Sequence, residues 1–230
     1  MTTTYTGKID RIDSCVIDGV PYFRVADYKS GSTKRFDYAD ILTGQAMQLI
    51  IYQRAIHAAH PELRESGFMY VPAKDSFVAL SCRPEDDETI TSAKKTEHER
   101  HGLLLDDIAV LDAMEELGTG KPEFLPIRVL RDGTVTGEVC TREQLHSLDD
   151  FTEIMMIREA NRIADGDITP NPISHGPGRT ACTYCPYKHA CMKELLGTSY
   201  RYRVKTSKDQ FFATVNETLY CCKRHPVKDL

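Results

Sequence analysis

Hydrophobic and polar positions near the start of the chain follow a strand pattern. Residues 5–13 and 20–29 are rich in β-branched and aromatic side chains, and the turn sequence Ile-Asp-Gly at 17–19 separates them. An Asp-Gly pair between two such runs is a strong signal of a β-hairpin. The pattern therefore predicts an antiparallel hairpin in this region.

Helical spacing replaces the strand pattern after residue 40. Apolar residues recur at helical intervals from Asp40 to Ala59, and Pro61 ends the pattern. This spacing predicts one mostly buried helix. The run FMYVPAKDSFVAL at 68–80 then predicts one or two further strands of the same sheet.

The second half of the chain predicts a loop, two helices and a second hairpin. Residues 84–101 have few apolar side chains, which favours a loop. We expect a helix over 103–117 and a hairpin turn at 131–133. Thr141 and Gln144 make a capping box for a long helix that ends near residue 166.

The order of these elements predicts an α/β fold with a mixed sheet. Strand, strand, helix and strand come first, and further helical and strand segments follow. We expect a core at 1–170 and a cysteine-bearing, loop-rich appendage at 171–230 packed on that core.

The composition is that of a globular protein. It adds to the analysis by excluding some classes of protein. Of the 230 residues, 41% are hydrophobic and 27% are charged. No apolar run approaches the roughly 18 residues that cross a bilayer, and no signal-peptide pattern is present. We therefore expect a cytoplasmic protein without a membrane partner. The net charge of −5 argues against a protein that coats nucleic acid with its whole surface, but a local basic groove remains possible.

The predicted hairpin carries charges inside its strands. Because side chains alternate across a strand, Asp27 and Lys29 share a face with Phe23 and Val25. A structural Asp–Lys pair is the simplest interpretation of these two residues. Asp10, on the neighbouring strand, adds a second carboxylate, and two close carboxylates repel unless a proton or a cation lies between them. A hard divalent cation such as Mg²⁺ suits such a pair, and a nearby lysine can stabilise negative charge that develops beside it.

Two polar residues interrupt the apolar pattern of the predicted helix. Gln48 and Tyr52 are four residues apart and therefore share one helix face. Taken alone, they are better explained by a buried glutamine that is satisfied by backbone groups. Their position after the charged hairpin makes them candidates for the same site.

These motifs resemble a known family. The series GKIDRID, VADYKSG and QLIIY is similar to the motifs of PD-(D/E)xK nucleases of the RecB type. With GFMYVPAKDSF, HGLLLDD and CTYCPYKHAC, the series resembles the C-terminal nuclease domain of the AddB component of AddAB helicase–nucleases. The likeness covers nearly the whole chain.

The resemblance implies a restriction-endonuclease-like fold and a Mg²⁺-dependent DNA nuclease. Such an exonuclease acts in a helicase–nuclease complex with an AddA-type partner, in double-strand break repair and recombination. Carried onto this chain, Asp10 and Asp27 would bind the metal and Lys29 would be the catalytic lysine. Gln48 and Tyr52 would line the site and contact DNA.

Cys182, Cys185 and Cys191 have the spacing C-x₂-C-x₅-C. Three thiolates so close suit Zn²⁺ or an iron–sulfur cluster, and each normally takes four ligands. The resemblance implies a [4Fe–4S] cluster whose fourth cysteine lies on the N-terminal side of the nuclease motifs. Only nine residues precede Asp10 and none is cysteine, so we expect that this fourth ligand, and the histidine and acidic residue that relatives carry upstream, are missing here. The chain resembles the tail of a longer polypeptide.

The sequence contains further basic and aromatic residues that are candidates for nucleic-acid contacts. It also allows one competing function. SYRYRVK at 199–205 alternates tyrosine and arginine, which suits either a single-strand contact or an edge strand. Other possible phosphate contacts are Lys34, Arg35, Arg179 and Lys188. The competing function is a non-catalytic module that binds DNA or docks to a partner protein. Asp10, Asp27 and Lys29 together favour the nuclease, and no P-loop motif is present to drive unwinding.

Overall fold

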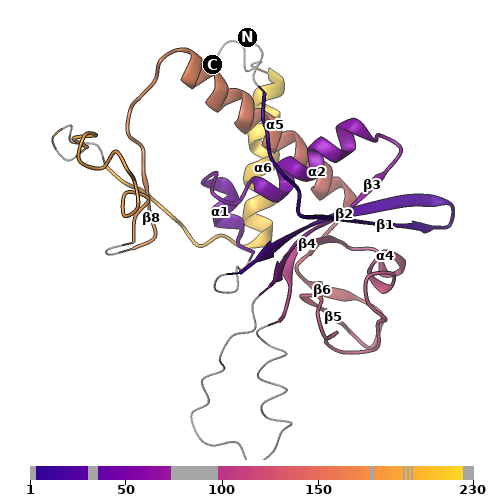
Figure 1. The fold of residues 1–230 in the computed structure, drawn as a ribbon. Helices are drawn as coiled ribbons and strands as arrows, with labels where there is room; N and C mark the ends of the chain where they lie inside the picture. The colour runs from indigo at the N-terminus through magenta and orange to yellow at the C-terminus, as the bar shows by residue number, and fades with distance from the viewer. Residues whose placement is uncertain are drawn as a thin grey trace, which may run out of the picture. The chain divides into compact units, whose positions relative to one another are not determined.

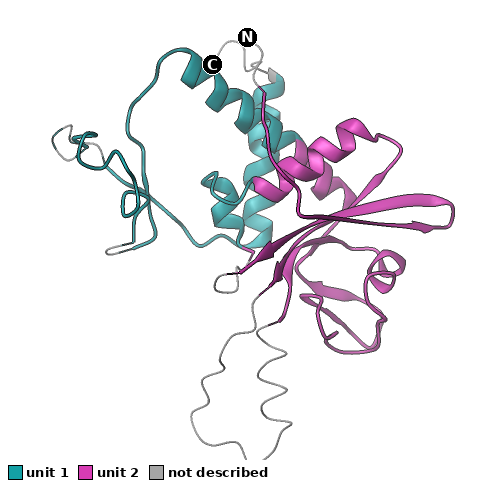
Figure 2. Cartoon of the chain, viewed as in Figure 1, with its two compact units in different colours: residues 1, 37–47, 150–230 teal, residues 2–36, 48–149 magenta. Residues whose placement is uncertain are grey.

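The computed structural model describes residues 4–30, 36–73, 98–176, 179–193, 195, 197 and 199–224. The chain divides into two compact units, shown in different colours in Figure 2. One comprises residues 2–36 and 48–149, and the other comprises residues 1, 37–47 and 150–230. We call them the sheet unit and the cysteine unit. The boundary predicted at residue 170 stays a prediction.

The sheet unit is built on a five-stranded mixed sheet in the order β1-β2-β3-β4-β7. Figure 1 labels β1, β2, β3 and β4 of this sheet. The strands are β1 (Arg11–Ile17), β2 (Val20–Lys29), β3 (Arg64–Pro72), β4 (His101–Leu105) and β7 (Val139–Cys140). The β1–β2 and β3–β4 pairs are antiparallel, whereas the β2–β3 and β4–β7 pairs are parallel. The predicted mixed α/β fold is thus confirmed.

The first hairpin turns where the sequence predicts it. Asp18 and Gly19 have φ angles of 51° and 77°, which is the left-handed conformation that a two-residue hairpin turn requires at both positions. The first strand was predicted over 5–13 but runs over Arg11–Ile17, so residues 5–10 precede the sheet instead of belonging to it.

The two faces of the sheet are covered by different elements. Helix α2 (Gln48–Ala59) lies on one side of the sheet in Figure 2, and helix α4 (Ile108–Asp112) lies on the other, with the hairpin of β5 (Ile127–Val129) and β6 (Val135–Gly137). The side of α4 holds a buried apolar cluster. Its members are Ala26, Met69, Leu104, Leu111, Leu125, Ile127 and Val139.

Two predicted helices are wrong in extent. The segment 40–59 forms two helices, α1 (Tyr38–Leu42) and α2, because Gly44 between them has a φ of 79° that a continuing helix cannot use. The helix predicted over 103–117 is a strand followed by a short helix. Residues 101–105 form β4 because they are buried between two other strands, and the Asp107 side chain caps α4 by accepting hydrogen bonds from backbone N–H groups.

Other predictions agree with the described residues. The strand predicted at 68–80 corresponds to β3, although 74–80 lies outside the described residues, as does most of the predicted loop at 84–101. The second hairpin is formed by β5 and β6. The long helix is α5 (Arg142–Ala164), and Thr141 and Gln144 exchange hydrogen bonds of 3.0 and 3.2 Å as the capping box requires.

The cysteine unit contains α1, most of α5, and α6 (Lys208–Arg224), together with the two-residue strands β8 (Ile173–Ser174) and β9 (Arg201–Tyr202). Tyr38 of α1 packs on Phe211 of α6 with ring centroids 4.9 Å apart. Helix α6 was not predicted, although Ser207 and Gln210 cap it with a reciprocal pair of hydrogen bonds. None of the helices in the described ranges is long and apolar enough to cross a membrane.

Candidate functional site

The end of β2 places Asp27 and Lys29 side by side on the face of the sheet that carries α2. The Asp27 side chain is buried, and its Oδ2 atom contacts Lys29 Nζ as an ion pair. In spite of this contact, Asp27 Oδ2 accepts no hydrogen bond of acceptable geometry within the described part of the chain. The ammonium of Lys29 does not use all the lone pairs of this carboxylate, so Asp27 can still coordinate a cation.

Tyr70 supports the lysine from the neighbouring strand. The register of β2 and β3 places Tyr70 directly opposite Asp27, and Lys29 Nζ lies 5.5 Å from the centre of the Tyr70 ring. An ammonium over an aromatic face is held there by the charge distribution of the ring. Sequence reasoning missed Tyr70, because the register between two strands that are far apart in the sequence cannot be read from their patterns.

Asp10 lies immediately before β1. It is exposed, and its Oδ2 atom accepts a hydrogen bond of 3.0 Å from the backbone N–H of Tyr28. Because Arg11 pairs with Ala26, the next position of this register would align Asp10 with Asp27. The structure thus brings Asp10 to the same end of the hairpin as Asp27 and Lys29, while its carboxylate is bound to the Tyr28 backbone.

Gln48, the first residue of α2, and Tyr52, one turn further along, contact each other. Gln48 Nε2 donates a hydrogen bond of 3.1 Å to the Tyr52 hydroxyl oxygen. The ring of Tyr52 lies against Gly7, where an added Cβ atom would come within 2.7 Å of Tyr52 Cε1. This pair therefore contacts the segment 7–10, which leads into the hairpin.

The donor set at the end of β2 fits a hard cation only in part. The Asp27 oxygen without a hydrogen bond is the kind of ligand that Mg²⁺ prefers, and Asp10 can add a second carboxylate. Within the described ranges, no three His, Cys, Asp or Glu side chains gather closely enough to hold a metal ion. The residues present therefore supply at most two protein carboxylates, a number that Mg²⁺ sites with water and phosphate ligands tolerate.

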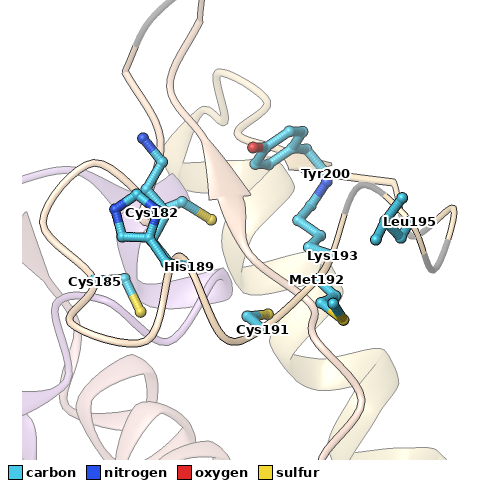
Figure 3. Close-up of a pocket in the computed structure, with 9 residues that line it drawn as sticks. Cys182, Cys185, His189, Cys191, Met192, Lys193, Leu195 and Tyr200 are labelled. Carbon is cyan, nitrogen blue, oxygen red and sulfur yellow. The ribbon is translucent and has the colours of Figure 1, made fainter.

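The three cysteines of the loop between β8 and β9 line one cavity of about 350 Å³ (Figure 3). Cys182, Cys185 and Cys191 are each partly buried, and none forms a disulfide bond within the described residues. Two tight turns hold the loop, with Cys185 N–H donating to Cys182 O and Cys191 N–H donating to Tyr187 O. The cavity thus offers three thiols for a metal centre that normally takes four ligands, and the described part of the chain does not gather them into a metal-binding group.

The predicted basic contacts have different surroundings. Arg203 is bound to Asp37 and Asp40, with 2.6 Å between Arg203 Nε and Asp40 Oδ1, so its charge is neutralised within the cysteine unit. Arg201 and Tyr202 of β9 are exposed, as are Arg179 and Lys188. Lys34 and Arg35 lie outside the described residues.

Several known proteins are similar in sequence to this chain. Residues 3–192 match the model of the PD-(D/E)XK nuclease superfamily. The B subunits of ATP-dependent helicase/deoxyribonucleases are similar to this chain: the protein of Moorella thermoacetica is 32% identical over 85% of the chain, and that of Caldanaerobacter subterraneus is 30% identical over 92%. The chain covers only 18% and 19% of the length of these two relatives. The superfamily match extends over most of the chain, including both strands of the charged hairpin and the cysteine loop, and the chain therefore belongs to the PD-(D/E)XK nuclease superfamily.

Proposed function

We propose that this chain is the nuclease domain of a helicase–nuclease complex and that it hydrolyses phosphodiester bonds of DNA with Mg²⁺. One observation carries the proposal. Asp27 is buried, and its Oδ2 atom forms an ion pair with the only lysine of β2 at the strand end where Asp10 also lies. A buried carboxylate beside a lysine and a second carboxylate suits a divalent cation with a charged group next to it.

The proposed roles follow from these positions. Asp27 and Asp10 would hold Mg²⁺, which would neutralise charge on the scissile phosphate when bound. The Lys29 ammonium would donate hydrogen bonds to the phosphate oxygen on which negative charge develops. Tyr70 keeps that ammonium at the strand end, because its ring lies beneath Lys29 Nζ.

Gln48 and Tyr52 would contact the DNA strand beside the reacting phosphate. The amide of Gln48 is exposed and is oriented by its hydrogen bond to the Tyr52 hydroxyl. An oriented amide and a phenol ring suit a nucleotide, since the amide can contact a phosphate or a base edge and the ring can stack.

The cysteine loop would hold an iron–sulfur cluster of the [4Fe–4S] type through Cys182, Cys185 and Cys191. The shared cavity supports this assignment, because all three thiols line it. The fourth ligand would come from outside this set. We assign no catalytic step to such a cluster.

The names of the relatives guide the wider proposal. They describe the B subunits of ATP-dependent helicase/deoxyribonucleases, so we propose that this domain acts on DNA ends in double-strand break repair and recombination, with an AddA-type protein as its partner and in the cytoplasm. The competing proposal is a non-catalytic DNA-binding or docking module. It is favoured by one observation: within the described ranges no three metal-binding side chains gather.

A comparison of two lysine variants separates these proposals. The purified chain would be incubated with a 5′-labelled single-stranded oligonucleotide and Mg²⁺, as wild type, as Lys29→Met and as Lys121→Met, a control whose exposed ammonium is paired with Glu99. A nuclease should lose cleavage on the order of 10²- to 10³-fold in Lys29→Met and little in the control. DNA binding without metal should remain within about twofold in both variants. Absence of Mg²⁺-dependent cleavage by the wild type and by an N-terminally extended wild type would favour the docking module.

A further inference from the structure

Three arginines gather on the face of the sheet opposite Asp27 and Lys29. Side chains alternate along β2, so Arg24 and Asp27 lie on opposite faces of the sheet. Arg11 pairs with Ala26, which places Arg11 on the same face as Arg24. Arg100 directly precedes β4, and alternation from His101, the partner of Tyr70, places it on this face too. We call these three residues the arginine cluster.

Arg11 and Arg24 share a single carboxylate. Arg11 Nε lies 2.6 Å from Asp13 Oδ1, and Arg24 Nε lies 2.8 Å from Asp13 Oδ2. Arg24 is only 8% exposed, and its Nη1 atom is buried without a hydrogen-bond partner in the described part of the chain. A buried guanidinium nitrogen without an acceptor is costly, so a further acceptor would stabilise it.

Arg100 has even fewer polar partners. Its guanidinium lies 4.8 Å from the centre of the Phe124 ring, and among the described residues this guanidinium makes no ion pair or hydrogen bond. Burial lowers the pKa of Arg100, and the nearby charges of Arg24 and Arg11 lower it further. This lowering agrees with the placement of the three arginines on one face of the sheet.

Two carboxylates face these three cations. Asp13 is shared as described, and Glu115, which also faces Arg100, accepts hydrogen bonds from the backbone N–H groups of Glu123, Phe124 and Leu125. Among the described residues, three guanidinium groups against two carboxylates leave one net positive charge, and Arg24 Nη1 lacks an acceptor. An added anion with several oxygens would correct both deficits at once.

We propose that the arginine cluster binds a phosphate group of the DNA strand. Arginine forks match the geometry of phosphate oxygens, and arginine is the preferred residue for bidentate phosphate contacts. The cluster is adjacent to the candidate site in the chain, because Arg11 follows Asp10. Arg11 Nη1 also donates a hydrogen bond of 3.1 Å to the hydroxyl of Tyr28, which lies between Asp27 and Lys29. A DNA strand that is cleaved on one face of the hairpin would then be held by the arginine cluster, on the opposite face, through another of its phosphates. This inference rests on the proposed function for the identity of the ligand.

The first test measures phosphate binding without DNA. The melting temperature of the purified chain would be followed against inorganic phosphate at constant ionic strength, with chloride as the replacement. The variants are Arg100→Gln, Arg11→Gln and the control Lys121→Gln. Phosphate should raise the melting temperature of wild type and control, because a ligand that binds only the folded state stabilises it. It should raise that of the two arginine variants much less. Equal rises in all four proteins, or no rise in the wild type, would overturn the site.

The second test identifies the DNA strand as the source of the phosphate. Affinity for a single-stranded oligonucleotide would be measured without metal over a range of salt concentrations. Each phosphate contact on a single strand contributes about 0.7 to the slope of log affinity against log salt. Arg100→Gln should lower the slope by about 0.7 and weaken binding roughly tenfold at low salt, whereas Lys121→Gln should do neither.

The two tests fail in distinguishable ways. If phosphate stabilises the wild type through Arg100 but the salt slope is unchanged in Arg100→Gln, the cluster binds free phosphate and the DNA part of the inference is wrong. If the wild type cleaves DNA in a Lys29-dependent manner and phosphate has no effect, the proposed function stands and the arginine cluster is purely structural. If the wild type binds no DNA at all, the proposed function fails, and with it the DNA assignment of the cluster.

Discussion

Gly7 lies against the ring of Tyr52, so closely that a Cβ atom at position 7 would come within 2.7 Å of Tyr52 Cε1 and 3.0 Å of its hydroxyl oxygen. The same hydroxyl accepts the hydrogen bond from Gln48. The approach of the segment before β1 to α2 thus depends on the absence of a side chain at residue 7.

Gly7→Ala should therefore disturb the candidate site more than it disturbs the fold. The methyl group must displace the Tyr52 ring, which removes the hydrogen bond from Gln48 and shifts the segment that leads to Asp10. We expect cleavage of single-stranded DNA to fall several-fold, with a loss of about 1 kcal/mol or less in the free energy of unfolding. Gly118→Ala is the matched control, because nothing lies within 4 Å of a Cβ atom there. Equal cleavage by the two variants would show that the contact is irrelevant to the site.

The Tyr70 ring should contribute to cleavage through Lys29. In Tyr70→Phe the aromatic face beneath Lys29 Nζ remains, whereas in Tyr70→Leu it is lost. The Tyr70 ring is buried, whereas Lys29 is partly exposed. A cation–π contact with a partly exposed cation is worth about 0.5–1 kcal/mol, which corresponds to a factor of roughly two to five. Single-turnover cleavage rates with saturating DNA should fall by about this factor from Phe to Leu at position 70. A leucine variant as fast as the phenylalanine variant would exclude the interaction from the reaction.

Asp13 should make stability depend on pH in the acid range. Burial alone raises the pKa of Asp13, but the hydrogen bonds from Arg11 and Arg24 outweigh it and hold the pKa below its usual value. A carboxyl group whose pKa is lower in the folded state stabilises the fold above its unfolded-state pKa, about 3.9, and this contribution is lost as the pH falls through the folded-state value.

Denaturant unfolding at several pH values tests this expectation. At pH 7, Asp13→Asn should lower the free energy of unfolding by about 2 kcal/mol, because two arginines lose their charged partner. The difference from wild type should shrink as the pH falls below about 3.9. The control Asp106→Asn changes an exposed aspartate of the same unit. A constant difference across the whole pH range would mean that the charge of Asp13 does not matter.

Features that depend on neighbours in the sequence could be predicted. The Asp18-Gly19 turn and the Thr141–Gln144 capping box are local, and both are found where the sequence places them. The shared face of Asp27 and Lys29 follows from alternation within one strand, and the structure brings the two side chains into contact. None of these predictions requires knowledge of which strands pair.

Features that depend on distant neighbours could not be predicted. The short apolar run of β4 suits a helix as well as a strand, and only its burial between β3 and β7 decides between them. Tyr70 and Arg100 join their sites through the register of β3 and β4, which the sequence patterns leave open. The approach of Gly7, in the segment before the first strand, to Tyr52 is equally non-local.

The last prediction concerns the cysteine loop of the chain purified alone. Cys182, Cys185 and Cys191 line one cavity and can supply three thiolates, whereas a [4Fe–4S] cluster normally takes four. The iron without a thiolate would be exposed to solvent and oxidant. We therefore expect well under four irons per chain after aerobic purification, and a larger content after anaerobic reconstitution that falls on exposure to air.

Iron and sulfide analysis, together with the visible absorption of the reconstituted protein, would measure this content. Cys185→Ser should abolish the reconstituted absorption, because only two loop thiolates would remain to hold the cluster. Cys221→Ser is the matched control, since Cys221 is an exposed cysteine of α6 in the same unit. Four irons per chain that survive air in the wild type would mean that a fourth ligand is present in this chain. Equal absorption in both serine variants would mean that the cluster does not bind at this loop.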